Sequence, residues 1–272
     1  MARRDSDPDF IEAIARGLDV ITAFGPAART MSLSEVATST GLARPTARRI
    51  LRTLEMQGYV HSVGGSFALT PKVMDLGMSY VRSMGLWPIA RPHMEALVRK
   101  THESTSIAQL DGSDIIYTCR VAVPKLVTLA VEIGTRFPAM QTSLGRVLLA
   151  ALSDDEVEQI LAEPNRSRIE PRWKPTPAER VKELSHVRAQ GWALADEELA
   201  PGVRSIAAPI RDGAGRVIAA LNVNAHAAET SVKTLVDEHL PRLLHAASDI
   251  SADWAKRGDA PMEIDETFGH GA

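Results

Sequence analysis

The stretch LARPTARRILRTLEMQGYV, residues 42–60, combines an apolar helical stripe with a cluster of arginines. On a helix that turns about 100° per residue, two sides of this stretch have opposite character. One side collects the apolar residues Ala47, Ile50, Leu51 and Leu54. The opposite half carries Pro45, Arg48, Arg49 and Arg52. The stretch therefore predicts a helix that packs on one side and presents positive charge on the other.

Two segments that precede it have the pattern of helices. Residues 10–25, FIEAIARGLDVITAFG, repeat apolar residues at steps of four, four and three before a Gly-Pro pair. These apolar residues are Phe10, Ile14, Leu18 and Ile21. Residues 32–41, SLSEVATSTG, have Ser32 and Glu35 at the spacing of a capping box, and a glycine suited to a left-handed C-terminal position. The sequence predicts one helix in each segment.

A short turn and a hairpin complete the pattern. Residues 41–43 form the turn that joins the second predicted helix to the arginine-rich one. Residues 59–71, YVHSVGGSFALTP, contain two β-prone runs around a Gly-Gly pair, which can adopt the positive φ angles of a tight hairpin. Two helices joined in this way form the helix-turn-helix unit, and a hairpin beside it forms a wing. Residues 9–71 are therefore interpreted as a winged helix-turn-helix DNA-binding domain.

The arginine-rich face fits the major groove of double-stranded DNA. Guanidinium groups bind guanine edges in bidentate fashion or bind phosphate oxygens, and nearby hydroxyls add further contacts. A charge cluster alone is more often a solvated surface, so the order of the surrounding elements carries the argument. The predicted DNA-binding residues are Arg44, Pro45, Thr46, Arg48, Arg49, Arg52 and Ser66.

Composition limits what the rest of the chain can be. The 272 residues carry a net charge of −3, which argues against coating nucleic acid through bulk charge but permits a local basic surface. This length favours two domains. No run approaches the roughly 18 apolar residues of a membrane span, so we expect a cytoplasmic protein without a membrane partner. Cys119 is the only cysteine, which excludes an intrachain disulfide and a cysteine-rich metal site.

The remainder of the chain predicts an α+β domain. A helix is expected from about residue 72 to 84, with a break near Gly85 and Pro88 and a second helix after it. Strands are expected at 105–121, around a turn at Asp111-Gly112, at 126–134, and in a hairpin at 203–225. Helices are expected at 142–153, 153–163, 175–192 and 231–254. Strands joined by hairpins and interleaved with helices indicate an antiparallel sheet.

The second domain offers little for catalysis. The sequence has no Gly-rich phosphate loop, no HExxH and no GxSxG motif. A lone cysteine in a β-prone run is more often buried than nucleophilic, and the acids at 196–198 precede a Pro-Gly pair as in a solvated loop. The histidines show no ligand spacing. We therefore predict no enzyme activity, no cofactor and no metal. The alternative function is that of a hydrolase or isomerase of small acids with an appended helical module. A weaker alternative is an architectural DNA-binding protein that binds no ligand.

Four ordered stretches carry a family resemblance: residues 32–60, 67–77 (FALTPKVMDLG), 134–152 (GTRFPAMQTSLGRVLLAAL) and 196–223 (DEELAPGVRSIAAPIRDGAGRVIAALNV). The chain resembles the IclR family of bacterial transcription regulators. The segments FIEAIARGLDVITAF, TARR and QTSLGRVLLAAL are similar to the subgroup that controls the protocatechuate and β-ketoadipate routes of aromatic acid breakdown. One departure is Ala43, where the family often has a serine that caps the recognition helix.

The resemblance implies a division of the chain and a mode of action. Residues 72–86 are expected to form a linker helix that helps to pair subunits, with packing within the domain as the alternative. Residues 87–256 are expected to form a GAF-like effector-binding domain. Residues 257–272 are interpreted as a disordered tail. The effector is expected to be a small aromatic or dicarboxylic acid such as protocatechuate, 4-hydroxybenzoate or β-ketoadipate. Operator DNA, RNA polymerase and further copies in a homodimer or tetramer are the expected partners, with activation favoured over repression.

Two features suggest where an acid binds. A helix starts at about Thr142, so its free N–H groups favour a carboxylate, although an ordinary capped helix start is the alternative. Asn222 and Asn224 share one face of a strand and interrupt an apolar run, and buried amides need partners. The family resemblance adds further positions, and Arg136 is an additional candidate to neutralise an acid. The predicted effector-binding residues are Thr142, Ser143, Leu144, Gly145, Asp196, Ser205, Asn222, Asn224, Cys119 and Arg120.

Overall fold

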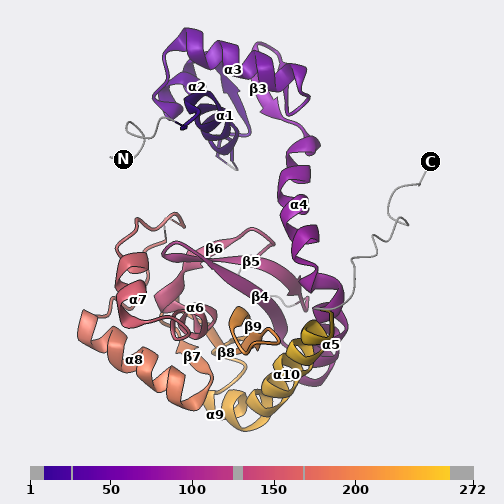
Figure 1. Ribbon diagram of the computed structural model, residues 1–272, viewed down its shortest axis with the longest axis vertical. Coiled ribbons are helices and arrows are strands. Elements are labelled where there is room, and N and C mark those ends of the chain that lie inside the picture. The colour runs from indigo at the N-terminus through magenta and orange to yellow at the C-terminus, as the bar shows by residue number, and fades with distance from the viewer. Residues whose placement is uncertain (1–8, 26, 125–130, 168, 258–272) are drawn as a thin grey trace, which may run out of the picture. The chain divides into compact units, whose positions relative to one another are not determined.

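The computed structural model describes residues 9–25, 27–124, 131–167 and 169–257. The chain divides into two compact units, Met1–Met84 and Gly85–Ala272 (Figure 1). The disordered tail expected at 257–272 and most of the strand expected at 126–134 lie outside the described residues. No helix in the described ranges combines the length and apolar character that a membrane crossing requires.

The first unit has helices and a small sheet in the predicted order. Its elements are α1 (Glu12–Thr22), β1 (Thr30–Ser32), α2 (Leu33–Thr40), α3 (Arg44–Met56), β2 (Val60–Val63), β3 (Ser66–Leu69), a 3-10 turn η1 (Pro71–Val73) and α4 (Met74–Met84). The capping box at Ser32 and Glu35 is present, and Gly41 is left-handed at φ 67°, so both predicted helix boundaries are confirmed. Gly64 and Gly65 take positive φ angles between β2 and β3, as a two-residue hairpin requires.

The sequence did not predict strand β1. Its three residues pair antiparallel with β3 and give a three-stranded sheet in the order β1-β3-β2. Met31 at its centre is buried and joins a core formed with α1, α2 and α3. A strand this short gains its structure from pairing with a distant segment rather than from its own pattern.

Helix α3 begins without a side-chain cap. Ala43 occupies the N-cap position with extended backbone angles and makes no side-chain hydrogen bond. A serine oxygen there would accept from the backbone N–H of Thr46, since Pro45 has no N–H to offer. The N-cap Ser32 of α2 makes such a bond to the Glu35 N–H. The start of α3 is therefore less stabilised than that of its neighbour.

We predict that Ala43→Ser stabilises the start of α3 by about 1 kcal/mol. Hydrogen exchange of the intact protein, read by mass spectrometry over residues 44–56, should slow by about fivefold for amides that exchange by local opening. The matched control is Ser32→Ala, which removes an existing cap and should speed exchange in α2 by a similar factor. Unchanged or faster exchange in Ala43→Ser would show that the missing cap does not limit this helix.

The second unit is built on a six-stranded antiparallel sheet in the order β6-β5-β4-β9-β8-β7. Its strands are β4 (Ser104–Asp111), β5 (Asp114–Val121), β6 (Arg136–Pro138), β7 (Ala193–Asp196), β8 (Val203–Arg211) and β9 (Val217–His226). Its helices are α5 (Leu86–Thr101), α6 (Ser143–Leu149), α7 (Asp154–Leu161), α8 (Pro177–Gln190), α9 (Val232–Thr234) and α10 (Leu240–Lys256), with a 3-10 turn η2 (Ala139–Gln141) before α6. The predicted α+β class and antiparallel sheet are confirmed.

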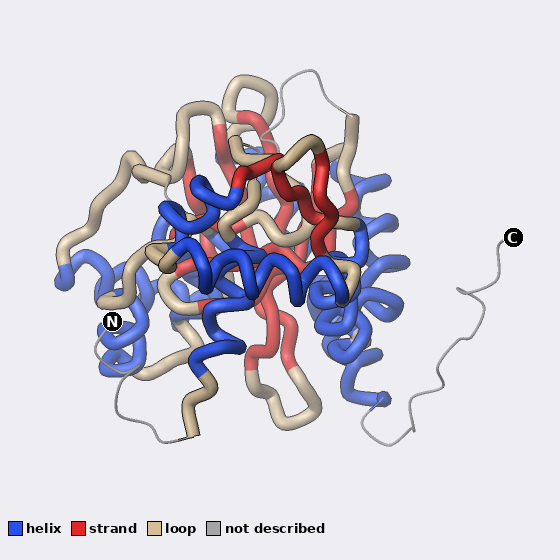
Figure 2. The backbone as a smooth tube through the Cα atoms, turned by 90° about the horizontal axis from the view of Figure 1, so that it is seen from above, coloured by secondary structure: helices blue, strands red, loops and turns tan. Residues whose placement is uncertain are grey.

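Helices cover both faces of this sheet. Helices α5 and α10 pack together against one face, and α6 crosses the other (Figures 1 and 2). Side chains alternate along β9, so Ala220, Asn222 and Asn224 share the face that α6 covers, while Leu221 and Val223 point to the other. Two asparagines on the α6 face interrupt an otherwise apolar core at one end of the strand.

The C-terminal helical segment departs from the single helix expected at 231–254. Ser231 caps α9 as an ordinary helix start, but a π-helical turn, η3 (Leu235–His239), separates α9 from α10. Pro241 follows directly in the first turn of α10. Because proline lacks the N–H that a continuous α-helix needs, the wider turn before it lets the segment continue without a break.

Candidate functional site

The arginines of α3 lie on the exposed side of the first unit. Ala47 and Leu51 are fully buried against the core, and Ile50 and Leu54 are half-buried beside them. The side chains on the opposite side are exposed: Arg44, Pro45, Arg48, Arg49 and Arg52. The structure therefore separates the helix into the packing side and the cationic side that the sequence predicted.

Local contacts of this surface are weak. Arg52 donates to the Glu55 carboxylate at 3.2 Å, with the arginine side chain 72% exposed. An exposed pair of this kind contributes little to stability, so the guanidinium can exchange Glu55 for another anion. Thr46 is half-buried on α3, and Ser66 is half-buried at the start of β3 in the hairpin.

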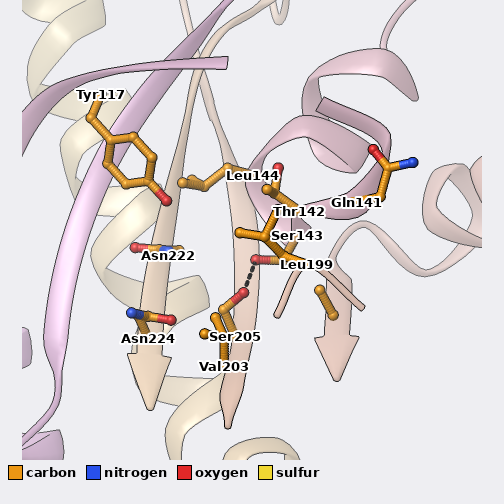
Figure 3. Close-up of a pocket in the computed structure, with 11 residues that line it drawn as sticks. Tyr117, Gln141, Thr142, Ser143, Leu144, Leu199, Val203, Ser205, Asn222 and Asn224 are labelled. Carbon is orange, nitrogen blue, oxygen red and sulfur yellow. Dashed lines mark hydrogen bonds between the residues drawn. The ribbon is translucent and has the colours of Figure 1, made fainter. Parts of the chain in front are cut away.

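The second unit contains a small polar cavity between α6 and the sheet (Figure 3). Its lining residues are Tyr117, Gln141, Thr142, Ser143, Leu144, Ala195, Leu199, Val203, Ser205, Asn222 and Asn224. The free space within it is about 20 Å³, which is room for roughly one water molecule. A ligand larger than water can enter only if the walls separate.

Side chains from the two walls meet across the cavity. Ser143 at the start of α6 and Ser205 on β8 are joined by a hydrogen bond of 2.7 Å between their hydroxyls (Figure 3). Asn222 and Asn224 come from the neighbouring strand β9, and Asn224 lies directly opposite Ser205 in the sheet. Hydroxyls and amides therefore line one end of a cavity whose remaining walls are apolar.

Asn222 is already part of the sheet's hydrogen-bond network. Its side-chain oxygen accepts from the backbone N–H of Ser106 at 2.9 Å, and its backbone oxygen accepts from the Thr105 hydroxyl. The amide nitrogen of Asn222 is thus the group that can donate to a ligand. Strand β4 therefore supplies one partner of this buried amide, and a ligand can supply a partner for its nitrogen.

Tyr117 reaches the cavity from β5. Its ring packs edge-on against Phe137 at 5.7 Å between centroids, and its hydroxyl points toward the polar end (Figure 3). Burial raises the pKa of Tyr117 above its ordinary value, against an opposing effect from the Arg120 charge. The phenol therefore stays protonated at neutral pH and can donate a hydrogen bond to an anionic oxygen.

The start of α6 is mostly an ordinary helix start. The Thr142 hydroxyl accepts from the Gly145 N–H at 3.0 Å and donates to the Ala139 oxygen at 3.1 Å. Gly145 does not line the cavity; a Cβ there would lie 2.0 Å from that same Ala139 oxygen. This glycine is required because α6 packs directly on the preceding backbone, which differs from the ligand-facing role that the sequence suggested.

Three further predicted residues do not line the cavity. Asp196 forms an ion pair with Arg204, at 2.5 Å between Oδ1 and Nε. Cys119 is buried, and burial raises its pKa to about 11, so it remains a thiol at neutral pH. Arg120 donates to the Ser106 hydroxyl at 3.0 Å. Because Ser106 pairs with both Arg120 and Asn222, Arg120 shares the face of the sheet on which the cavity lies.

Sequence reasoning missed five lining residues: Tyr117, Gln141, Ala195, Leu199 and Val203. Tyr117 and the predicted Cys119 are two residues apart on β5, but a bulge opposite Ile107 and Ala108 places them on opposite faces of the sheet, so simple alternation does not select Tyr117. Gln141 immediately precedes the predicted Thr142. The other three belong to a strand end and a loop whose apolar side chains carry no sequence signal for a ligand.

Arg146 does not line the cavity but links several segments of its wall. This guanidinium on α6 is only 2% exposed, donates to the Met140 oxygen at 3.0 Å and the Leu194 oxygen at 2.8 Å, and pairs with Glu183 and Glu198. Its guanidinium also stacks on Trp173, 4.6 Å from the ring centroid. Met140, Leu194 and Glu198 each adjoin a lining residue in sequence, so one side chain links three segments of the cavity wall.

Metal chemistry finds no support in the described part of the chain. No group of three or more histidine, cysteine, aspartate or glutamate side chains there is placed to hold an ion. Each acid of the run 196–198 pairs with a different arginine. Asp196 pairs with Arg204, Glu197 with Arg172 and Glu198 with Arg146.

Comparison with known families matches both units. Residues 13–64 match the model of the IclR helix-turn-helix domain, and residues 78–252 match that of the bacterial transcriptional regulator IclR C-terminal domain. Together the two matches contain α3 and every residue that lines the cavity.

Curated relatives cover nearly the whole chain. The Pca regulon regulatory protein of Pseudomonas putida is 39% identical over 90% of this chain and 84% of its own. The p-hydroxybenzoate hydroxylase transcriptional activator of Acinetobacter baylyi is 30% identical over 89% of this chain and 91% of its own.

Solved structures agree with the fold. A Rhodococcus sp. RHA1 protein is 43% identical, with a TM-score of 0.79, over 91% of this chain and 99% of its own. The inducer-binding domain of the PobR transcription factor from Acinetobacter, a double mutant in complex with 3-hydroxybenzoic acid, is 27% identical, with a TM-score of 0.56, over 60% of this chain and 96% of its own.

Proposed function

Because the chain belongs to the IclR family of bacterial transcriptional regulators, we propose that it binds operator DNA through the exposed arginines of α3 and senses a hydroxylated aromatic acid in the α6 cavity. Its family and its relatives are transcriptional regulators, so the chain is a regulator of transcription and not an enzyme. One observation carries the proposal: the chain combines an arginine face on a helix-turn-helix unit with a separate cavity lined by hydroxyls and amides.

The DNA-binding part of the proposal assigns roles to the α3 side chains. The arginines project from one exposed side of a helix whose other side is fixed by the core. Such a helix enters the major groove, where Arg48, Arg49 and Arg52 contact base edges or phosphates. Arg44 and Thr46 at the helix start and Ser66 in the wing are assigned phosphate contacts.

Cavity chemistry favours an aromatic hydroxy acid over a dicarboxylate. The described lining residues include no lysine or arginine, so nothing on the wall neutralises two negative charges. Leu144, Leu199 and Val203 suit an apolar ring, and the hydroxyls and amides suit a phenol and one carboxylate. Arg120 lies on the same face of the sheet, but it donates to Ser106 and does not line the cavity. The Acinetobacter baylyi relative and the inducer-binding domain carry names that include hydroxybenzoates, which supports 4-hydroxybenzoate or protocatechuate as effector.

Effector binding must open the cavity. A space of about 20 Å³ excludes an aromatic acid, for which a cavity on the order of 150 Å³ is needed even for benzene. An acid therefore binds a more open arrangement of α6 and the sheet better than the closed one. A ligand that discriminates between two arrangements shifts their populations, which is the requirement for an allosteric effect on DNA binding.

Apolar surface on the first unit supports pairing of two chains. The stripe predicted on the first helix is exposed: Phe10, Ile14 and Leu18. Helix α4 exposes Leu76 as well. Two copies joined through such surfaces would present two α3 helices to two operator half-sites, which is the basis for proposing a homodimer or a tetramer.

Activation is the proposed sense of regulation. The Acinetobacter baylyi relative is named as a transcriptional activator, and activation implies a contact with RNA polymerase that follows operator binding. A protein that acts on bacterial operators works where the chromosome lies, so the proposed location is the cytoplasm.

The proposal predicts that an aromatic acid changes operator affinity. An operator is first selected from random DNA with the full-length protein, and its binding is then measured by fluorescence anisotropy at fixed salt. Saturating 4-hydroxybenzoate should shift the dissociation constant by about fivefold or more, the usual range of allosteric coupling. The neutral analogue 4-hydroxybenzyl alcohol, which lacks the carboxylate, is the control and should have no effect. Calorimetric binding of the acid without any shift would refute the coupling.

A further inference from the structure

The second unit contains another cavity, which shares the lining residue Gln141 of η2 with the first. About 240 Å³ of free space lies between the β4–β5 turn, η2, the loop after α7 and the start of α8. Three prolines, a methionine and a leucine form its apolar walls. The polar side chains that line it are Ser113, Gln141, Glu163, Asn165, Lys174 and Arg180. Its size is sufficient for a benzoate, since a cavity on the order of 150 Å³ holds benzene.

Two donors beside this cavity have no hydrogen-bond partner within the described structure. The hydroxyl of Ser113 and the Nε–H of Arg180 are both buried and unpaired. Buried polar groups in proteins nearly always have partners, so these two groups are available to bind a ligand. The Arg180 Nε–H can only donate and the Ser113 hydroxyl can donate or accept, so both can bind a carboxylate oxygen.

Two cations line the cavity, and each also pairs with an acid outside it. Arg180 binds the Glu158 carboxylate through Nη2, at 2.9 and 2.8 Å, and Lys174 binds Glu170 at 2.7 Å. Neither of those acids lines the cavity, whereas Lys174 and Arg180 do, against the single lining acid Glu163. Two cations on the lining, together with the apolar walls, suit a carboxylate with an apolar body.

We propose that this cavity is a second binding site for a small monocarboxylic acid, with Ser113 and Arg180 as its carboxylate-binding residues. Gln141 lines both cavities, and its side-chain nitrogen donates to the Trp173 oxygen at 3.1 Å. An acid in the second cavity fixes Gln141 and so changes the wall of the first. The two sites are then thermodynamically coupled, and this coupling, unlike the site itself, rests on the proposed effector role of the first cavity.

The site is tested with 4-bromobenzoate as probe. Crystals of the full-length protein grown with the probe locate bromine by anomalous diffraction, and calorimetry in solution gives the number of sites. We expect bromine in both cavities and two probe molecules bound per chain. Bromine in the first cavity alone overturns the second site. Bromine in the second cavity alone supports the second site and contradicts the proposed effector cavity, so the two failures are distinguishable.

Variants separate binding from folding. Ser113→Ala should weaken probe binding at the second cavity by about fivefold to tenfold, the usual range for one hydrogen bond, without lowering the melting temperature, because an unpaired hydroxyl does not stabilise the fold. Arg180→Gln should abolish binding there, whereas Glu158→Gln should strengthen it by releasing the guanidinium. If the cavity is a ligand site, these two variants of one ion pair change probe affinity in opposite directions. Equal losses of probe affinity in both variants would show that the ion pair is structural and would overturn the assignment.

Discussion

Replacing Arg48 and Arg49 together by alanine is expected to lower operator affinity by roughly a hundredfold or more. Each bidentate arginine contact with a base is worth about 1–3 kcal/mol of discrimination, and two contacts on one helix add approximately. Both side chains are exposed, on the opposite side of α3 from the buried Ala47 and Leu51. The fold should therefore tolerate the change, and the loss should appear in DNA binding alone.

The measurement is anisotropy of the selected operator over a series of salt concentrations. Loss of a base contact relaxes the sequence preference. Loss of a phosphate contact instead lowers the slope of log affinity against log salt concentration by about one for each arginine. Glu55→Gln is the matched control: it removes the acid that holds Arg52 at 3.2 Å and should strengthen binding. Equal operator affinity in the double variant and the wild type would refute α3 as the recognition helix.

The helix-turn-helix unit was predictable because its signals are local. The capping box of α2, the left-handed Gly41 and the hairpin glycines each specify backbone geometry within a few residues. Strand β1 has no such signal, since it depends on β3, which lies more than thirty positions along the chain. Ile14 and Leu18 of the predicted apolar stripe lie on α1 and Phe10 precedes it, but periodicity does not reveal that these three side chains stay exposed in a single chain.

The cavity was only partly predictable because it is assembled from distant segments. Alternation along one strand is local, so Asn222 and Asn224 could be assigned to one face, and both line the cavity. The opposite walls come from residues 141–144 and 195–205, and their meeting depends on sheet order and on the packing of α6. Arg146 illustrates the limit: arginine is rarely buried, and a single sequence gives no sign that this one links three wall segments.

Arg146 also bears on how the cavity opens. Its partners lie on η2, β7, α8 and the loop after β7, so separation of the walls stretches contacts to one guanidinium. Within that set, Glu198 belongs to the loop that carries Leu199, which lines the cavity. A hydrogen bond joins the two ends of this loop, since the Glu197 carboxylate accepts from the Gly202 N–H at 2.8 Å.

Replacing Asn224 by aspartate should reduce the affinity for 4-hydroxybenzoate by about a hundredfold. The two side chains have nearly the same shape, so the change adds a negative charge to a cavity wall where a carboxylate is proposed to bind. Two like charges about 5 Å apart repel by roughly 3 kcal/mol at an effective dielectric constant near 20. Asn224 is half-buried, so the new carboxylate retains some solvent and stays ionised at neutral pH.

Charge and shape are separated by the control and by the choice of ligand. Asn224→Ser stays neutral and loses at most one hydrogen bond, so calorimetry should show a loss of about tenfold or less. The cationic analogue 4-hydroxybenzylamine should bind Asn224→Asp better than it binds the wild type, which reverses the preference. If Asn224→Asp binds 4-hydroxybenzoate as tightly as the wild type does, the carboxylate does not lie at this end of the cavity, and Arg120, beyond Ser106 on the same face, becomes its proposed partner.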